Sequence, residues 1–204
     1  MKSCSITLIL ALFCLPALVL AAGDPAAGKG KAGTCVACHS EDGNSVNPIW
    51  PKLAGQYENY LVKQLKDLRA GQQGPRYDPV MSPMAANLSD QDIADLAAYY
   101  ASQKQTPGKA QQDLVAVGER IYRGGNKATQ VTACIACHGP DGSGNDAANY
   151  PRLSGQHAQY IELQLRAFRE GKRKNSANGM METISHHLSE PEIKAVSSYI
   201  EGLH

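Results

Sequence analysis

The sequence predicts an all-α protein made of two tandem domains of similar fold. The first observation is an internal repeat, because Cys35-Val-Ala-Cys38-His39 recurs as Cys134-Ile-Ala-Cys137-His138 about 100 residues later. The second is helical periodicity in both halves, with no stretch of sustained period-two alternation. The third is a shortage of large aromatic residues, with one Trp and two Phe among 204 residues. Two small domains with so few aromatics need another large apolar group to fill their cores.

Residues 1–21 are predicted to be a secretory signal peptide. Lys2 gives a short positive start, residues 6–20 form an apolar run, and residues 19–21 end in the small residues that a signal peptidase reads. The run is short for a membrane span, which leaves an uncleaved anchor as the weaker alternative. A lipoprotein modified at Cys14 is disfavoured, since Phe13 stands where a small residue is expected. We therefore expect export to the periplasm.

Without the signal peptide the chain has equal numbers of basic and acidic side chains. The chain therefore lacks the excess of basic residues that is typical of nucleic acid-binding proteins. A polar segment carrying Pro107 and Gly108 separates the halves, so we predict one domain over 22–106 and a second over 107–204. Further repeated motifs, Pro-Lys-Leu-Ala-Gly-Gln56 and Pro-Arg-Leu-Ser-Gly-Gln156, support a tandem duplication.

Capping residues and apolar spacing predict the helices. Asp24 is a candidate N-cap with Pro25 in the first turn, which opens a short helix to about Ala32. Residues 57–70 place their apolar side chains on one helical face before a glycine ends the helix. Capping boxes at Ser89 and Ser189 open the last helix of each domain. The inward side chains of these last helices are Ile93, Leu96, Tyr100, Ile193, Val196 and Ile200.

Long stretches over 40–56 and 71–87 are predicted to be irregular. Structureless loops of this length are unusual in a compact domain unless they are functional. We expect them to wrap a large bound group.

The Cys-x-x-Cys-His pattern is the attachment motif of c-type haem. Cys35 and Cys38, and likewise Cys134 and Cys137, lie about one helical turn apart and can form thioethers with the two vinyl groups of a porphyrin. The adjacent His39 and His138 are the candidate proximal iron ligands. Three alternatives are a thioredoxin-like redox pair, a zinc site formed by the four cysteines, and structural disulfides. The missing βαβ context, the unexplained histidines and the strain of so short a disulfide loop argue against them.

A methionine in each second loop is the candidate sixth ligand. Met81 and Met181 each precede a repeated leucine by the same spacing, whereas Met180 has no such counterpart and remains a rival of Met181. His/Met ligation raises the reduction potential of haem iron. Three histidines lack a partner in the first half and are not expected to ligate iron: His157, His186 and His187.

Several further residues are candidates around the haem. The carbonyl oxygens of Pro51 and Pro151 can accept a hydrogen bond from the proximal histidines, although a loop-stiffening role explains these prolines equally well. Side chains that could line the haem or its propionates are Gln56, Gln156, Tyr60, Tyr160, Arg69 and Arg169.

With its two Cys-x-x-Cys-His motifs, the repeated Pro-x-Leu-x-Gly-Gln segments and the ending Tyr-Ile-Glu-Gly-Leu-His204, the chain resembles the dihaem cytochrome c4 family, tandem class I cytochromes c. The resemblance implies two helical modules related by a pseudo-twofold axis, each wrapped around one covalently bound haem c, with the propionates of the two haems near each other. It places the axial ligands at His39 and Met81 and at His138 and Met181. It also implies electron transfer in the periplasm toward a haem-copper terminal oxidase.

From these features we expect an electron carrier rather than an enzyme. With both axial positions filled, iron has no open site for a substrate, and electrons pass by outer-sphere transfer. The expected partners are an upstream cytochrome reductase and a downstream terminal oxidase, both docking transiently. We expect a monomer and leave peripheral membrane association open. The alternatives are a dihaem redox enzyme, such as a peroxidase or a sulfur-compound dehydrogenase, and a fixed electron-transfer subunit of a larger complex.

Overall fold

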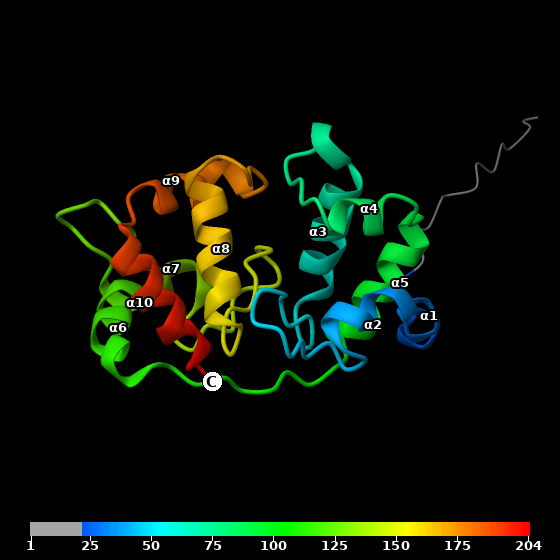
Figure 1. Cartoon of the computed structure of the whole chain (residues 1–204), viewed down its shortest axis with the longest axis horizontal. Helices are drawn as coiled ribbons and strands as arrows, with labels where there is room; N and C mark the ends of the chain where they lie inside the picture. Colours follow the sequence, from blue (N-terminus) through cyan, green and yellow to red (C-terminus); the bar gives the residue numbers. More distant parts are fainter. Residues whose placement is uncertain (1–21) are drawn as a thin grey trace, which may run out of the picture.

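The computed structural model describes residues 22–204, so the signal peptide predicted for residues 1–21 lies outside the described residues. The chain forms two helical lobes that an extended segment, residues 103–111, joins along one edge (Figure 1). The first domain contains α1 (Pro25–Lys31), α2 (Gly33–His39), α3 (Glu58–Arg69), α4 (Met81–Ala85) and α5 (Asp90–Ala101). The second contains α6 (Val115–Gly124), α7 (Ile135–His138), α8 (Ala158–Arg169), α9 (Met180–His186) and α10 (Glu190–Glu201).

The helix ends follow the capping signals of the sequence. The Asp24 carboxylate accepts from the Ala26 backbone N–H at 2.8 Å, and Pro25 begins α1. Reciprocal capping boxes at Ser89 and Ser189 open α5 and α10. Gly71, at φ 65°, follows the end of α3. These local predictions are confirmed because each depends on hydrogen bonds within one turn.

The predicted irregular stretch over 71–87 is wrong in part. The structure places a 3₁₀ turn at Gly71–Gln73 and the short helix α4 there, and the longer α9 in the second domain. The Asp78 carboxylate accepts from the backbone N–H groups of Val80 and Met81 at 2.9 and 2.8 Å, which starts α4. A helix of five residues is too short to show a hydrophobic period. Across residues 22–204 the only β structure is isolated bridges, as the sequence predicts.

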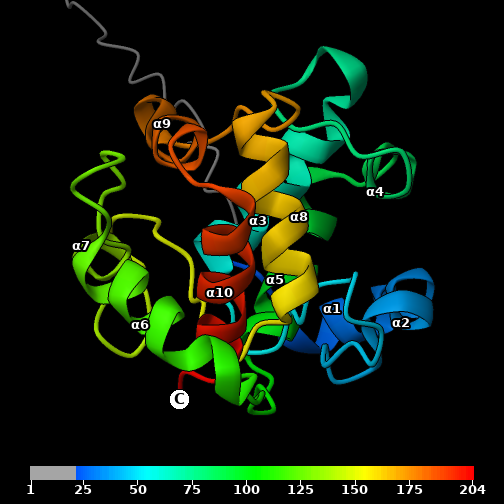
Figure 2. The same ribbon diagram turned by 60° about the vertical axis from the view of Figure 1, so that its left-hand side comes forward.

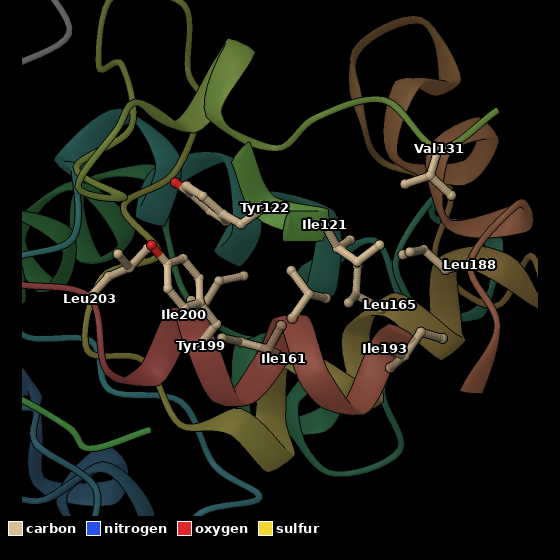
Figure 3. Close-up of a cluster of buried hydrophobic side chains, with 11 residues drawn as sticks. Ile121, Tyr122, Val131, Ile161, Leu165, Leu188, Ile193, Tyr199, Ile200 and Leu203 are labelled. Carbon is tan, nitrogen blue, oxygen red and sulfur yellow. The ribbon is translucent and has the colours of Figure 1, made fainter. Parts of the chain in front are cut away.

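Each domain packs its first helix against its last. In the second domain α6 lies against α10, and α8 completes a cluster around Ile121, Tyr122 and Ile193, each at most 2% exposed (Figure 3). Cys134 and Met181 are partly buried against this same cluster. In the first domain Cys35 packs against the smaller core around Leu96 and Tyr100. The apolar cores therefore extend to the repeated cysteine motifs.

The domains meet through reciprocal hydrogen bonds near a junction flanked by α3 and α8 (Figure 1 and Figure 2). The Gln56 amide pairs with the Arg152 backbone, and the Gln156 amide pairs with the Lys52 backbone. The Tyr57 hydroxyl donates to the Ser143 carbonyl at 2.7 Å. These contacts, made twice in the same pattern, are consistent with the pseudo-twofold relation of the domains.

Candidate functional site

The first candidate site is formed by α2, which carries Cys35, Cys38 and His39. One helical turn brings the two thiols to neighbouring positions, and His39 ends the helix, 3% exposed. Both cysteines are free and half-buried. Burial raises the pKa of the Cys35 thiol, which keeps it protonated at neutral pH. Cys35 is therefore not the activated thiolate that a redox-active cysteine pair requires.

The second site repeats this arrangement at α7. Cys134 immediately precedes the helix, and Cys137 and His138 lie at its end. Burial raises the pKa of Cys134 to about 11. His138 is buried like His39, at 7% exposure. Both motifs thus present two free thiols and one buried imidazole.

The alternative chemistries find no support in this geometry. In the described part of the chain no three His, Cys, Asp or Glu side chains converge to hold a metal ion, so the four cysteines form no zinc site. All four are free rather than joined in disulfides. The described residues also contain no βαβ unit, the usual context of a thioredoxin-like pair.

The two histidines are oriented by proline carbonyls. His39 Nδ1 lies 2.9 Å from the Pro51 oxygen, and His138 Nδ1 lies 3.0 Å from the Pro151 oxygen. A carbonyl only accepts, so each Nδ1 carries the proton and each Nε2 keeps a free electron pair. Burial lowers the pKa of both imidazoles, which keeps them neutral. The predicted proline contact is confirmed, and a neutral imidazole held in this tautomer is suited to binding a metal through Nε2.

The candidate methionines occupy matching positions. Met81 begins α4, and Met181 is the second residue of α9; both are half-buried. The Met81 backbone N–H donates to Asp78, and the Met181 N–H donates to the Ser176 hydroxyl at 3.0 Å. The N–H of Met180, which is also half-buried, donates instead to the backbone carbonyl of Ala177. In its local hydrogen bonding, Met181 rather than Met180 is therefore the equivalent of Met81.

Other predicted lining residues have structural partners. Arg69 donates to the Leu88 carbonyl and pairs with Asp90, and Arg169 makes the same contacts with Leu188 and Glu190. Both arginines thus tie α3 or α8 to the start of the last helix.

Polar residues of the junction include some that sequence reasoning placed elsewhere. Gln56 and Gln156 cross to the opposite domain instead of closing their own site. His157 also crosses, with its Nε2 2.7 Å from the Ser45 carbonyl oxygen.

His186 and His187 pack edge to face, with ring centroids 5.6 Å apart, and are exposed and half-exposed respectively.

Two functional candidates were missed by sequence reasoning, Arg76 and Arg173. They meet at the junction beside Tyr60 and Tyr160. Their positions in the two halves differ by three residues from the register of the repeat, so the repeat does not reveal them.

Comparisons with known proteins agree with the duplicated site. The family model described as Cytochrome c matches residues 26–104 and again 122–204. Cytochrome c4 of Azotobacter vinelandii is 52% identical over 211 residues, covering all of both chains. A thiosulfate dehydrogenase electron acceptor of Stutzerimonas stutzeri is 38% identical, covering 83% of this chain and 78% of the relative.

The structural comparison gives the same result. The crystal structure of reduced recombinant cytochrome c4 from Pseudomonas stutzeri superimposes with a TM-score of 0.87 at 48% identity, covering 90% of this chain and all of that one. Two cytochrome c domains imply two covalently bound haem c groups. This chain belongs to the cytochrome c4 family of dihaem electron carriers.

Proposed function

We propose that Cys35 and Cys38 attach one haem c and that His39 and Met81 are its axial ligands. In the second domain Cys134 and Cys137 attach the other haem, with His138 and Met181 as ligands. The observation that carries this assignment is the contact between a buried histidine and a proline carbonyl, made once in each domain. This contact fixes the imidazole with Nε2 free, directly after a pair of unbonded thiols.

The surrounding residues fit the cofactor. The Arg152 Nε is buried without a hydrogen-bond partner. Such a group is costly unless it is paired, and a carboxylate of a bound haem could accept from it. The free thiols at the edges of the two cores match covalent attachment.

The chain's residues favour electron transfer over catalysis. A bound haem supplies a one-electron Fe(II)/Fe(III) couple. His39 with Met81, and His138 with Met181, would occupy both axial positions of a bound haem, and a thioether ligand would raise its reduction potential relative to a second histidine. The protein then holds two electrons and offers no open position to a substrate, in contrast to the dihaem peroxidase or dehydrogenase alternative.

We propose that the mature protein works in the periplasm as a monomer, with its domains over 22–106 and 107–204. Among residues 22–204 no helix is long and apolar enough to cross a membrane. A cytochrome reductase would donate electrons and a haem-copper terminal oxidase would accept them, both by transient docking. The near-zero charge of the polypeptide supports weak electrostatic steering.

A second candidate donor follows from one relative. The Stutzerimonas stutzeri protein carries the name thiosulfate dehydrogenase electron acceptor. By analogy, a sulfur-compound dehydrogenase is an alternative electron source for this chain, either as a transient donor or in a fixed complex.

A spectroscopic redox titration of the purified holoprotein tests the proposal. We expect two reversible one-electron steps with low-spin spectra in both oxidation states. A high-spin haem in the oxidised or half-reduced protein would favour the enzyme instead. Co-purification of a dehydrogenase after a high-salt wash would favour the fixed subunit over the free carrier.

A further inference from the structure

Arg173 is a buried cation held by residues of both domains. It is 6% exposed, and its guanidinium lies 4.4 Å from the centre of the Phe168 ring. It donates to Gln164 of its own domain at 2.8 Å and to the Tyr60 hydroxyl of the first domain at 2.9 Å. It also donates to the Gln64 amide oxygen at 3.0 Å.

Arg76 is the counterpart of Arg173 from the first domain. It donates to Gln64 at 2.7 Å and crosses the junction to the Tyr160 hydroxyl at 3.1 Å. The backbones of Arg76 and Arg173 form an isolated antiparallel bridge, and the Lys174 N–H donates to the Pro75 carbonyl at 2.8 Å. Each guanidinium therefore binds a tyrosine of the opposite domain.

The two cations share one neutral acceptor. The Gln64 amide oxygen accepts from both guanidiniums and from the Asn175 amide. Neither arginine forms an ion pair with a carboxylate among residues 22–204. Carboxylates are nearby but not bonded to either arginine: Asp78 acts on the Arg76 guanidinium through space, and Asp67 accepts from Asn175 at 2.8 Å.

Like charges gathered at a partly desolvated junction are unfavourable unless an anion is nearby. The phenol of Tyr60 reports the positive potential. Its burial opposes ionisation, but the nearby guanidiniums of Arg173 and Arg76 outweigh this effect and lower the pKa of Tyr60. The positive potential at the junction thus favours the binding of an anionic group. None of the side chains bonded to the two arginines provides that negative charge.

We propose that Arg76 and Arg173 are shared counter-charges for the carboxylates of both haems, and that each arginine therefore sets the potentials of both haems. The inference rests on the proposed haem in each domain. The arginines are positioning residues, since they act on iron through charge and through the propionates. A cation near haem stabilises the ferrous form, so removing it lowers the potential.

Substitutions that separate charge from shape test this proposal. In the holoprotein, Arg173→Gln and Arg76→Gln remove the charge, and Arg173→Lys and Arg76→Lys keep it. Arg120→Gln is the matched control, because Arg120 is an exposed arginine of α6 in the second domain. Spectroelectrochemical titration gives the two potentials, and the paramagnetically shifted haem methyl resonances assign each potential to its haem.

We expect Arg173→Gln to shift both ferrous/ferric equilibria toward the oxidised form, each by about three- to tenfold. The lysine variants should keep most of the wild-type potentials, and Arg120→Gln should leave both nearly unchanged. A shift confined to one haem, no shift, or equal shifts for Gln and Lys would overturn the proposal. If the wild-type protein shows two reversible one-electron steps with low-spin spectra, any of these outcomes overturns the role of the arginines and leaves the carrier function intact. If the wild-type protein lacks these two redox steps, the result contradicts the carrier function itself. If a Gln variant does not fold, the Lys variants still test the proposal, because they must retain both potentials.

Discussion

The side-chain amide of Gln156 in the second domain closes two hydrogen bonds with the backbone of Lys52 in the first. The Lys52 N–H donates to Oε1 at 2.9 Å, and Nε2 donates to the Lys52 carbonyl at 2.8 Å. Gln56 makes the same pair of bonds with Arg152, at 3.0 and 2.9 Å. Each glutamine satisfies a backbone segment of the other domain, so the two domains hold a fixed relative orientation.

Removing this pairing should loosen the junction. Gln156→Ala leaves the buried backbone groups of Lys52 without partners, and we expect a loss of about 1–3 kcal/mol in the free energy of unfolding. Denaturant unfolding followed by circular dichroism measures this loss. The exposed Gln72 gives the control Gln72→Ala, which should be nearly neutral. Equal stability of the two variants would show that the crossing glutamines do not hold the domains.

The close approach of α1 and α5 depends on Gly28. A Cβ at this position would collide with the carbonyl oxygen of Asp95 and with the Tyr99 side chain. We expect Gly28→Ala to cost about 1–3 kcal/mol through overpacking. In the same helix Gly30 faces open space, so Gly30→Ala should be neutral or stabilise by up to about 1 kcal/mol. Thermal unfolding of the two variants compares them directly, and similar melting temperatures would refute this packing.

The Asp95 carboxylate should make the stability of the first domain depend on pH in the acidic range. The Lys31 ammonium, the Asp24 N–H and the Gln91 amide bind the Asp95 carboxylate and lower its pKa from 3.8 to about 2. A lowered carboxylate pKa stabilises the fold fully above the unfolded value, and this stabilisation is lost as the pH falls from about 4 to about 2.

The variant Asp95→Asn isolates this effect. The stability difference between wild type and variant should be constant above about pH 4 and should shrink toward about pH 2. Denaturant unfolding across this range measures the difference. The second domain has Ala195 at the matching position and serves as an internal reference. A difference that does not change with pH would contradict the ion-pair origin.

The fold was predictable from the sequence where the signals are local or duplicated. Capping at Asp24 and Ser89 depends on a few neighbouring residues, and the repeat carries each assignment into the second half. The proline carbonyl contact of His39 follows from general metal-site chemistry.

The residues that the sequence did not reveal act between domains. Gln56 and Gln156 were expected to line the haem or its propionates, but their partners are set by the docking of two surfaces. The repeat does not pair Arg76 with Arg173, because the two residues are three positions out of register in the sequence although they make equivalent contacts in the structure. No local propensity encodes such a contact.

The most direct test of the two His/Met haems is the methionine–iron charge-transfer band of the oxidised protein, measured in Met81→Ala, Met181→Ala and the control Met180→Leu. We expect each alanine variant to lose about half of the band and to lower the potential of one haem, because the weak thioether ligand is removed. Met180→Leu should leave the band and both potentials unchanged. Loss of the band in Met180→Leu with an intact band in Met181→Ala would assign the ligand to Met180, and an unchanged band in both alanine variants would contradict His/Met ligation by these residues.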